Sequence, residues 1–135
     1  MPYNFRVAID RRELMVALAA TVLPLDSPAA PHGAREMFGM IVKMTAASGQ
    51  RETLIQILLQ ATREMPGCFS YVIGEDASND NDIWITEVWD SKIKHDASLS
   101  LPAVRDAIAK AKPIIAAFGT PIITRPVGGH GLPNG

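Results

Sequence analysis

The order of secondary-structure signals between residues 37 and 127 constrains the fold more than any other feature of the sequence. Four short segments are rich in β-branched and aromatic residues, and two longer ones carry apolar residues at helical spacing. The expected order is therefore strand, helix, strand, strand, helix, strand. Proline and glycine crowd both flanks, at 24–31 and 128–135, and such punctuation is typical of domain boundaries. The sequence predicts one domain of about 90 residues.

The expected strands are short and bounded by turn residues. They cover Phe38–Met44, Cys68–Glu75, Ile83–Trp89 and Pro121–Val127. The polar stretch 76–82 separates the second from the third, so we expect these two to form a hairpin. Because Pro126 lacks a backbone donor, the end of the last strand is expected at a sheet edge.

The first helix is expected after Ser48-Gly49, which can cap it, and before Pro66-Gly67, which stops it. Its apolar stripe comprises Leu54, Leu58, Ala61 and Met65. A short polar helix is expected to run through Leu99, because Ser91 can cap it.

The last helix is expected to begin at Pro102. Proline has no backbone N–H, and the N–H groups of a first helical turn make no hydrogen bond within the helix, so proline is tolerated there. Its buried face comprises Val104, Ile108, Ala111, Ile115 and Phe118. Pro113 is expected to kink this helix, and Gly119 to close it.

This βαββαβ order predicts an α+β fold of the ferredoxin-like type, in which helices cover one face of an antiparallel sheet. Both faces of the expected strands carry apolar residues. For example, Ile83 and Ile85 point to one face, and Trp84 and Val88 point to the other. A sheet covered on one side is normally polar on the other. The sequence therefore predicts a homodimer in which two sheets pack face to face.

The leader, residues 1–36, has the layout of a signal peptide. Arg11 and Arg12 precede an uncharged stretch, Leu14–Leu25, and small residues follow around Ser27–Ala29. The paired arginines resemble a twin-arginine export signal and predict a periplasmic or exported protein. The alternative is a cytoplasmic protein in which this segment is an amphipathic helix that packs on the domain or on a partner subunit. The apolar stretch is too short to span a bilayer, which takes about 20 residues.

Composition excludes several classes of site. With 13 basic and 14 acidic side chains, the net charge of −1 argues against a nucleic-acid-binding surface. Cys68 is the one cysteine, so there is no internal disulfide and no thiolate zinc cluster. The histidines, His32, His95 and His130, lie far apart, and no phosphate-loop or dinucleotide motif is present. We therefore expect no metal and no cofactor.

The remaining chemistry gathers on the hairpin and the short helix after it. The candidate residues are Tyr71, Trp84, Glu87, Trp89, His95 and Ser98. Apolar walls with a few polar tips are the usual composition of a small-molecule site. A glutamate on an apolar strand face is either paired or functional. Imidazole exchanges protons near neutral pH, which suits proton transfer by His95.

Structural roles remain open for each candidate. Glu87 can instead make a structural hydrogen bond or an ion pair, for example with Lys43 or Arg125 on neighbouring strands. The tryptophans and Tyr71 can be core or dimer packing. His95 can lie on a solvated helix face, and Cys68 can be a packed, inert thiol.

The runs PGCFSYVIGED (66–76) and IWITEVWDSKIKHDASLSLPAV (83–104) resemble the antibiotic biosynthesis monooxygenase domain family, which includes quinol monooxygenases. The resemblance covers about residues 38–127. It implies a dimeric ferredoxin-like α+β barrel and the oxygenation of phenols or quinols without flavin, haem or metal. The family also includes haem-degrading members. Many members carry a histidine nine residues after the tryptophan of the Glu-x-Trp motif, where this chain has Ser98, and His95 lies one helical turn earlier.

The expected function is a cofactor-independent monooxygenase that oxidises a phenol or quinol with O₂ to a quinone. The residues expected at the catalytic centre are His95, Glu87 and Trp89, with proton transfer assigned to His95 or Glu87 and a pocket wall to Trp89. The residues expected to bind the substrate are Tyr71, Trp84, Ser98, Phe38 and Phe118. The alternatives are a non-catalytic dimeric module that binds a small aromatic molecule, and haem degradation, which needs a histidine ligand.

Overall fold

The computed structural model describes residues 36–133. The expected leader, residues 1–35 of it, and the last two residues lie outside the described part of the chain. The elements follow in the order β1 (Phe38–Ala46), α2 (Arg51–Ala61), β2 (Cys68–Glu75), β3 (Asp82–Trp89), α3 (Lys92–Ser98), α4 (Pro102–Ala111), a 3-10 turn (Lys112–Ile114), β4 (Ile115–Phe118) and β5 (Ile122–Thr124).

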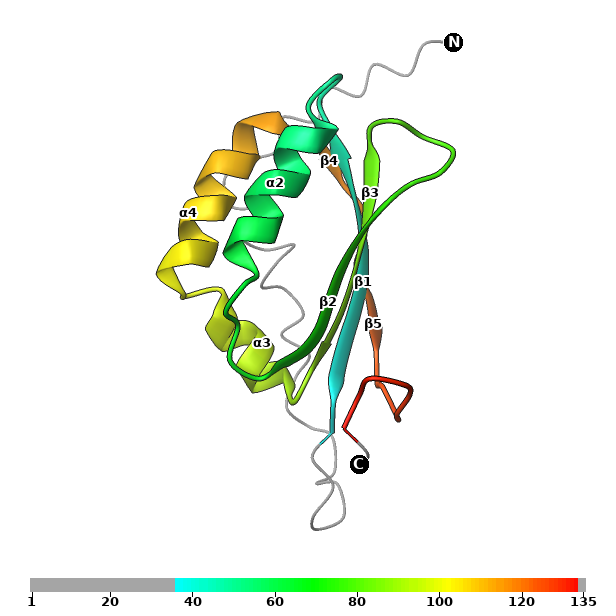
Figure 1. The fold of residues 1–135 in the computed structure, drawn as a ribbon, viewed down its shortest axis with the longest axis vertical. Coiled ribbons are helices and arrows are strands. Elements are labelled where there is room, and N and C mark those ends of the chain that lie inside the picture. The colour runs from blue at the N-terminus through cyan, green and yellow to red at the C-terminus, as the bar shows by residue number, and fades with distance from the viewer. Residues whose placement is uncertain (1–35, 134–135) are drawn as a thin grey trace.

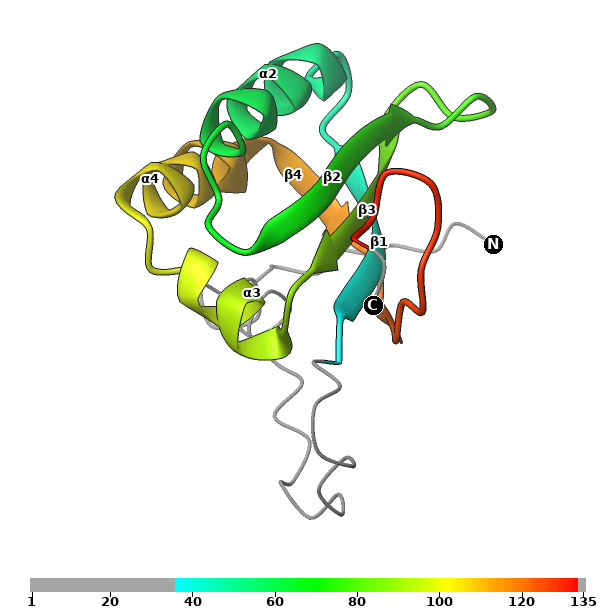
Figure 2. The ribbon, with the colours of Figure 1, turned by 60° about the horizontal axis from the view of Figure 1, so that its bottom comes forward.

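The strands form one antiparallel sheet in the order β2-β3-β1-β4, and β5 also pairs with β1. Helices α2, α3 and α4 all lie on the same face of this sheet (Figure 1). The view in Figure 2 shows the two long helices side by side across the sheet, with α3 at one end. The predicted ferredoxin-like fold is therefore confirmed.

The core lies between the helices and the inner face of the sheet. Alternate residues of β1, from Phe38 to Ala46, are buried there, as are Ile83, Ile85 and Trp89 of β3. From α2, Leu54 has no exposed surface at all. The alternation fixes the register of the sheet, because a slip by one residue would turn these side chains to the other face.

The first helix is shorter than predicted at both ends. Gly49 adopts a positive φ of 76° in a turn, so the helix begins only after Gln50, which makes no side-chain capping bond. The prediction that Ser48-Gly49 caps the helix was therefore wrong. The helix ends at Ala61, where the Thr62 hydroxyl donates to the Leu58 carbonyl. Met65 consequently lies in the following loop rather than on the helix.

The last helix ends seven residues before the predicted end at Phe118. The chain leaves the α-helix at Ala111, makes a 3-10 turn through Pro113, and continues as β4. Proline removes a backbone donor and its ring clashes with the preceding turn, so it ends this helix rather than kinking it. Residues 121–127, predicted as one strand, contribute only the three-residue β5, and β4 is the strand that completes the βαββαβ order.

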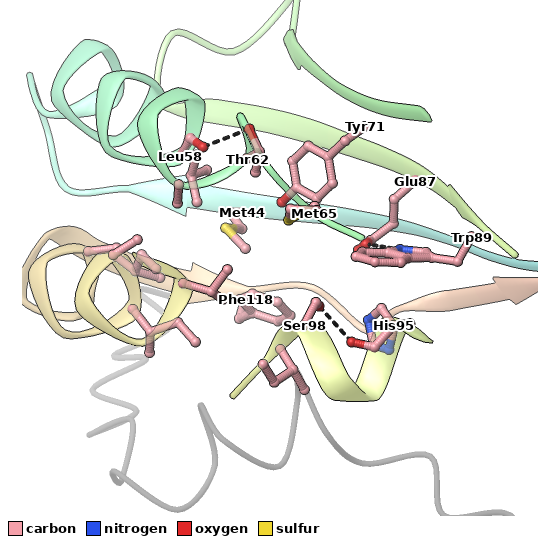
Figure 3. A pocket seen from close by; sticks show the side chains of 17 residues that line it. Met44, Leu58, Thr62, Met65, Tyr71, Glu87, Trp89, His95, Ser98 and Phe118 are labelled. Atoms are coloured by element: carbon pink, nitrogen blue, oxygen red, sulfur yellow. Dashed lines mark hydrogen bonds between the residues drawn. The ribbon is translucent and has the colours of Figure 1, made fainter. Parts of the chain in front are cut away.

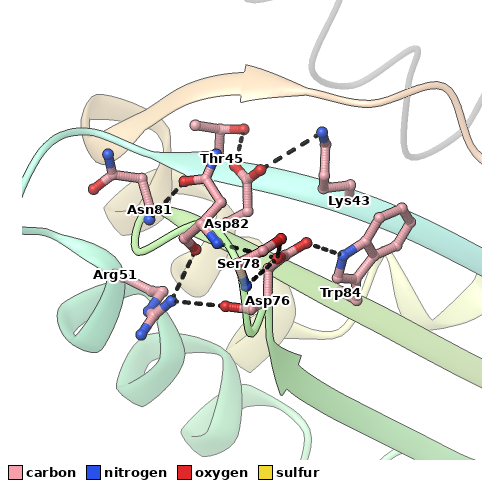
Figure 4. Close-up of polar contacts among 9 residues, drawn as sticks. Lys43, Thr45, Arg51, Asp76, Ser78, Asn81, Asp82 and Trp84 are labelled. Carbon is pink, nitrogen blue, oxygen red and sulfur yellow. Dashed lines mark hydrogen bonds and ion pairs between the residues drawn. The ribbon is translucent and has the colours of Figure 1, made fainter.

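The hairpin loop between β2 and β3 is held by its acidic side chains (Figure 4). One Asp76 oxygen accepts bonds from Ser78 and Asn79, and the other accepts from Trp84 Nε1 at 2.7 Å. These bonds lower the pKa of Asp76 to about 2, the one from Trp84 being the strongest cause. Across the strands, Asp82 pairs with Lys43 at 3.5 Å. Asp76 therefore organises the turn, and Asp82 links β3 to β1.

The outer face of the sheet carries exposed apolar side chains, Val72, Trp84 and Ile122. Lys43 lies over the Trp84 ring at 5.9 Å. Within residues 36–133, no helix has the length and hydrophobicity that crossing a bilayer requires.

Candidate active site

A cavity lies between the inner face of the sheet and helices α2, α3 and α4 (Figure 3). Most of its wall is apolar, with Met44 and Phe118 on the sheet side and Leu58 on α2. About 70 Å³ is open to the centres of water molecules. Because one water needs roughly 10–15 Å³ on this measure, the cavity is larger than a packing defect.

Glu87 and Trp89 are neighbours in the wall of this cavity. They lie two residues apart on β3, so both side chains point to the inner face of the sheet. Trp89 Nε1 donates to Glu87 Oε2 at 2.6 Å, and both residues are buried. Within residues 36–133, no other side chain makes a hydrogen bond to the carboxylate. Every fully buried side-chain oxygen in this part of the chain has a hydrogen-bond partner, so an oxygen without a partner is not fully buried. The second oxygen of Glu87 is therefore open to the cavity.

The environment of Glu87 makes its carboxylate a stronger base than that of an exposed glutamate. Burial raises the pKa of the carboxyl, whereas the bond from Trp89 and the nearby His95 act in the opposite direction without reversing the shift. Neither of the basic partners considered from the sequence reaches it. Lys43 pairs with Asp82, and Arg125 with Glu36. Trp89 is thus the hydrogen-bond partner that the described structure gives to this carboxylate.

Tyr71 lies opposite Glu87 on β2 and points into the same cavity. Its hydroxyl makes no hydrogen bond within the described residues and, by the same reasoning, is open to the cavity. Burial, and then the negative charge of Glu87, raise the pKa of this phenol. The hydroxyl is therefore a protonated donor that faces the cavity.

His95 lies on α3, whose first turn is capped by the Ser91 side chain at 3.3 Å from Lys94 N. Its ring packs against Phe38 at 4.8 Å and edge-on to Trp89 at 5.5 Å between centroids. The residue is 5% exposed, so the alternative of a solvated face was wrong.

The two ring nitrogens of His95 have different surroundings. Nδ1 lies 3.0 Å from Asp96 Oδ1. The pKa of Asp96 is lowered because bonds from Lys92 and His95 outweigh the opposing effect of partial burial. A carboxylate at Nδ1 favours the tautomer with its proton there, which leaves Nε2 as a proton acceptor.

Ser98 lines the cavity but its hydroxyl is already used. It donates to the carbonyl of His95 at 2.6 Å, one turn earlier on α3. Phe118 lines the cavity from β4. Phe38 does not line it and instead packs against His95.

Trp84 lies on the opposite face of the sheet and is 40% exposed, so a role as a wall of this cavity does not fit its position.

Cys68 begins β2, and its thiol donates to the carbonyl of Ser70 at 3.4 Å. Burial raises the pKa of this thiol to about 11, which fits the expected inert cysteine.

Sequence reasoning missed several lining residues, among them Met44, Thr62 and Met65. The signal was present, because the stripes interpreted as core, Leu58–Met65 and Val104–Phe118, supply much of the cavity wall. It also missed Asp96, whose position next to His95 is the available clue. Within residues 36–133, no group of three or more histidine, cysteine or acidic side chains is placed to hold a metal ion.

Comparison with known proteins identifies a family model and several solved structures that are similar to this chain. The family model described as antibiotic biosynthesis monooxygenase matches residues 37–110. A crystal structure from Chloroflexus aurantiacus J-10-fl, described as a "putative antibiotic biosynthesis monooxygenase", is 55% identical. The match covers 70% of this chain and 96% of that chain, with a TM-score of 0.68.

More distant structures share the fold. A protein of the same description from Nitrosomonas europaea is 14% identical, with a TM-score of 0.63 over 71% of this chain and 95% of its own. Another, from Caulobacter crescentus CB15, is 17% identical, with a TM-score of 0.58 over 67% and 87%. No curated protein sequence matches this chain. The family model and the 55% identical structure together show that the chain belongs to the antibiotic biosynthesis monooxygenase family.

Proposed function

We propose that the protein is a cofactor-independent monooxygenase that oxidises a phenol or quinol with O₂ to a quinone. The observation that carries the proposal is the wall of the cavity formed by Tyr71, Glu87 and His95. Each presents a polar atom that has no partner within the described residues, inside a cavity that is otherwise apolar. Buried polar groups are normally satisfied, so such atoms are the expected contacts of a ligand.

The apolar walls suit an aromatic ring, and the polar atoms suit its hydroxyl groups. A hydroxyl placed against the open oxygen of Glu87 is also within the reach of Tyr71, which pairs with Glu87 across the strands. Because burial raises the pKa of the carboxyl, Glu87 is a stronger base than an exposed glutamate and is suited to accept a phenolic proton. His95 Nε2 is the second candidate acceptor.

The reaction needs no group beyond substrate, O₂ and a proton acceptor. The phenol transfers its proton to Glu87 or His95, and the phenolate gives one electron to O₂. Recombination at the para carbon forms a C–O bond, and the returning proton makes a hydroperoxide. The O–O bond then breaks, the ring carbon loses its proton, and water leaves. Phenol and O₂ thus give a quinone and water, with four electrons passing from substrate to O₂.

We further propose that the protein acts as a homodimer joined through the outer faces of two sheets. Three exposed apolar residues lie on strands of one sheet: Val72, Trp84 and Ile122. Single exposed apolar residues are common on protein surfaces, whereas a group of them on one face indicates an interaction surface. Sedimentation equilibrium tests this, and Val72→Asp should shift the protein toward monomer. A stable wild-type monomer at micromolar concentration would contradict the dimer.

The activity is tested by oxygen uptake with a panel of phenols and quinols on metal-free protein. We expect uptake by the wild type, and a loss of at least about tenfold in Glu87→Gln or His95→Ala, since a general base typically contributes 10²–10⁴-fold. Asp106→Asn is the matched control, because its carboxylate is exposed on α4 and pairs with Lys110 away from the cavity.

Uptake that is unchanged in both cavity variants would refute the assigned roles. Quenching of tryptophan fluorescence by quinones, without any oxygen consumed, would instead identify a binding module. A haem titration that shifts the Soret band in the wild type and not in His95→Ala would point to haem chemistry.

A further inference from the structure

We propose that Glu87, held in one orientation by Trp89, makes the cavity select neutral ligands that donate a hydroxyl and reject anionic ones. This inference rests on the proposed function, because it concerns the ligand of the same cavity. Glu87 is here a specificity-determining residue, and Trp89 is the positioning residue that decides which of its oxygens meets the ligand.

The orientation follows from one short contact. The indole Nε1–H of Trp89 holds Glu87 Oε2 at 2.6 Å. Trp89 is itself 1% exposed and packed edge-on against His95, so its ring has little freedom to turn away. The carboxylate is consequently fixed, and its remaining oxygen faces the cavity as an acceptor.

The charges around the cavity are unfavourable to an anion. None of the residues that line it is a lysine or an arginine. Of the two lysines on α3, Lys92 is held by Asp96 at 2.6 Å, and Lys94 is exposed, with the stem of its side chain beside Gly67. A carboxylate in an apolar cavity repels a second one strongly, because little water is present to screen the pair. His95 lines the cavity too, but its Nδ1 already faces the charge of Asp96.

The substitution Glu87→Gln tests the geometry because it should reverse the polarity of the wall. The indole of Trp89 needs an acceptor, so it will hold the amide oxygen of the glutamine. The amide NH₂ then occupies the place of the open carboxylate oxygen. A wall that presented an acceptor and a negative charge presents a neutral donor instead.

The experiment is calorimetric titration without O₂, using 2-naphthol, 2-naphthoate and 2-methoxynaphthalene as probes. All three probes share the naphthalene ring. The substituent is a hydrogen-bond donor in 2-naphthol, an anion in 2-naphthoate, and an acceptor without a donor in 2-methoxynaphthalene. For the wild type we expect 2-naphthol to bind at least about tenfold more tightly than either of the others, which corresponds to about 1.4 kcal/mol. For Glu87→Gln we expect 2-naphthoate to gain at least about tenfold and 2-naphthol to lose affinity.

Two further variants complete the test. Asp106→Asn also removes one carboxylate, from an exposed pair on α4, and should leave all three affinities unchanged. Trp89→Phe releases the carboxylate while keeping its charge. It should still reject 2-naphthoate but lose the preference for 2-naphthol over 2-methoxynaphthalene, and this variant decides the matter if Glu87→Gln does not fold.

The outcomes separate this inference from the proposed function. Equal wild-type affinities for 2-naphthol and 2-naphthoate, or a Glu87→Gln variant with an unchanged preference, overturn the inference even if quinols are oxidised. Oxygen uptake with a quinol but no binding of 2-naphthol also overturns it. Neutral selectivity without any oxygen uptake supports the inference and refutes the monooxygenase proposal.

Discussion

Replacement of Trp89 by phenylalanine should destabilise the protein by removing the hydrogen bond that Trp89 donates to Glu87. The donor lies 2.6 Å from the carboxylate in a buried site. Loss of a hydrogen bond to a charged buried group costs about 1.5–3 kcal/mol, and the smaller ring gives up about 1 kcal/mol of apolar burial. The expected loss in the free energy of unfolding is therefore about 2.5–4 kcal/mol.

The size of this loss should depend on pH. Burial raises the pKa of Glu87 in the folded protein, so the cost of burying its charge is absent while the carboxyl is protonated in both states. That cost appears as pH rises through the folded-state pKa. The bond from Trp89 offsets part of it, because the bond favours the ionised form. The destabilisation by Trp89→Phe should thus be larger at about pH 8 than at about pH 5.

Urea unfolding followed by circular dichroism measures these differences, at fixed protein concentration so that any association contributes equally. Glu87→Gln and the double variant complete the thermodynamic cycle. In the glutamine background the lost bond is neutral, so Trp89→Phe should cost about 1 kcal/mol less than in the wild type. Equal losses at both pH values, together with additive single effects, would refute the reasoning.

The remaining predictions concern the framework and use the same unfolding assay. Leu54→Ala should cost about 2–5 kcal/mol, because the side chain has no exposed surface and leaves a cavity in the core. Ser91→Ala should cost about 0.5–2 kcal/mol, since its side chain caps the helix that carries the imidazole. Gly67→Ala should cost about 1–3 kcal/mol, because Gly67 has a φ of 83° and a Cβ there would lie 2.7 Å from Lys94 Cβ. A cost below about 0.5 kcal/mol at any of these positions would contradict the packing or backbone geometry described for it.

The sequence predicted the hairpin well because its signals are local. The bounds of β2 were predicted, and β3 begins only one residue earlier than expected. The last helix was overextended because Ile115 and Phe118 continue the helical spacing of Val104 and Ile108. Spacing alone does not show that Pro113 ends the helix. The residues after Pro113 form a strand because β4 can pair with β1, and this pairing is a tertiary contact.

The site was predictable in part for the same reason. Alternation along β3 places Glu87 and Trp89 on one face, and their contact follows from that spacing. The position of His95 beneath Phe38 depends on how α3 docks against the sheet, which no local pattern specifies. Trp84 was assigned to the pocket because of its residue type. It lies three residues before Glu87 on the same strand, and an odd separation along a strand already placed it on the other face of the sheet.

The cavity wall and the hydrophobic core are built largely from the same layer of side chains. Met44, Ala111 and Trp89 belong to both. A ligand in this cavity fills space that folding creates, so it binds the folded chain and not the unfolded one. At a concentration of 100 times its dissociation constant, such a ligand adds about 2.7 kcal/mol of stability. The melting temperature is therefore a readout for compounds that occupy the cavity, and a library can be searched before any turnover is known.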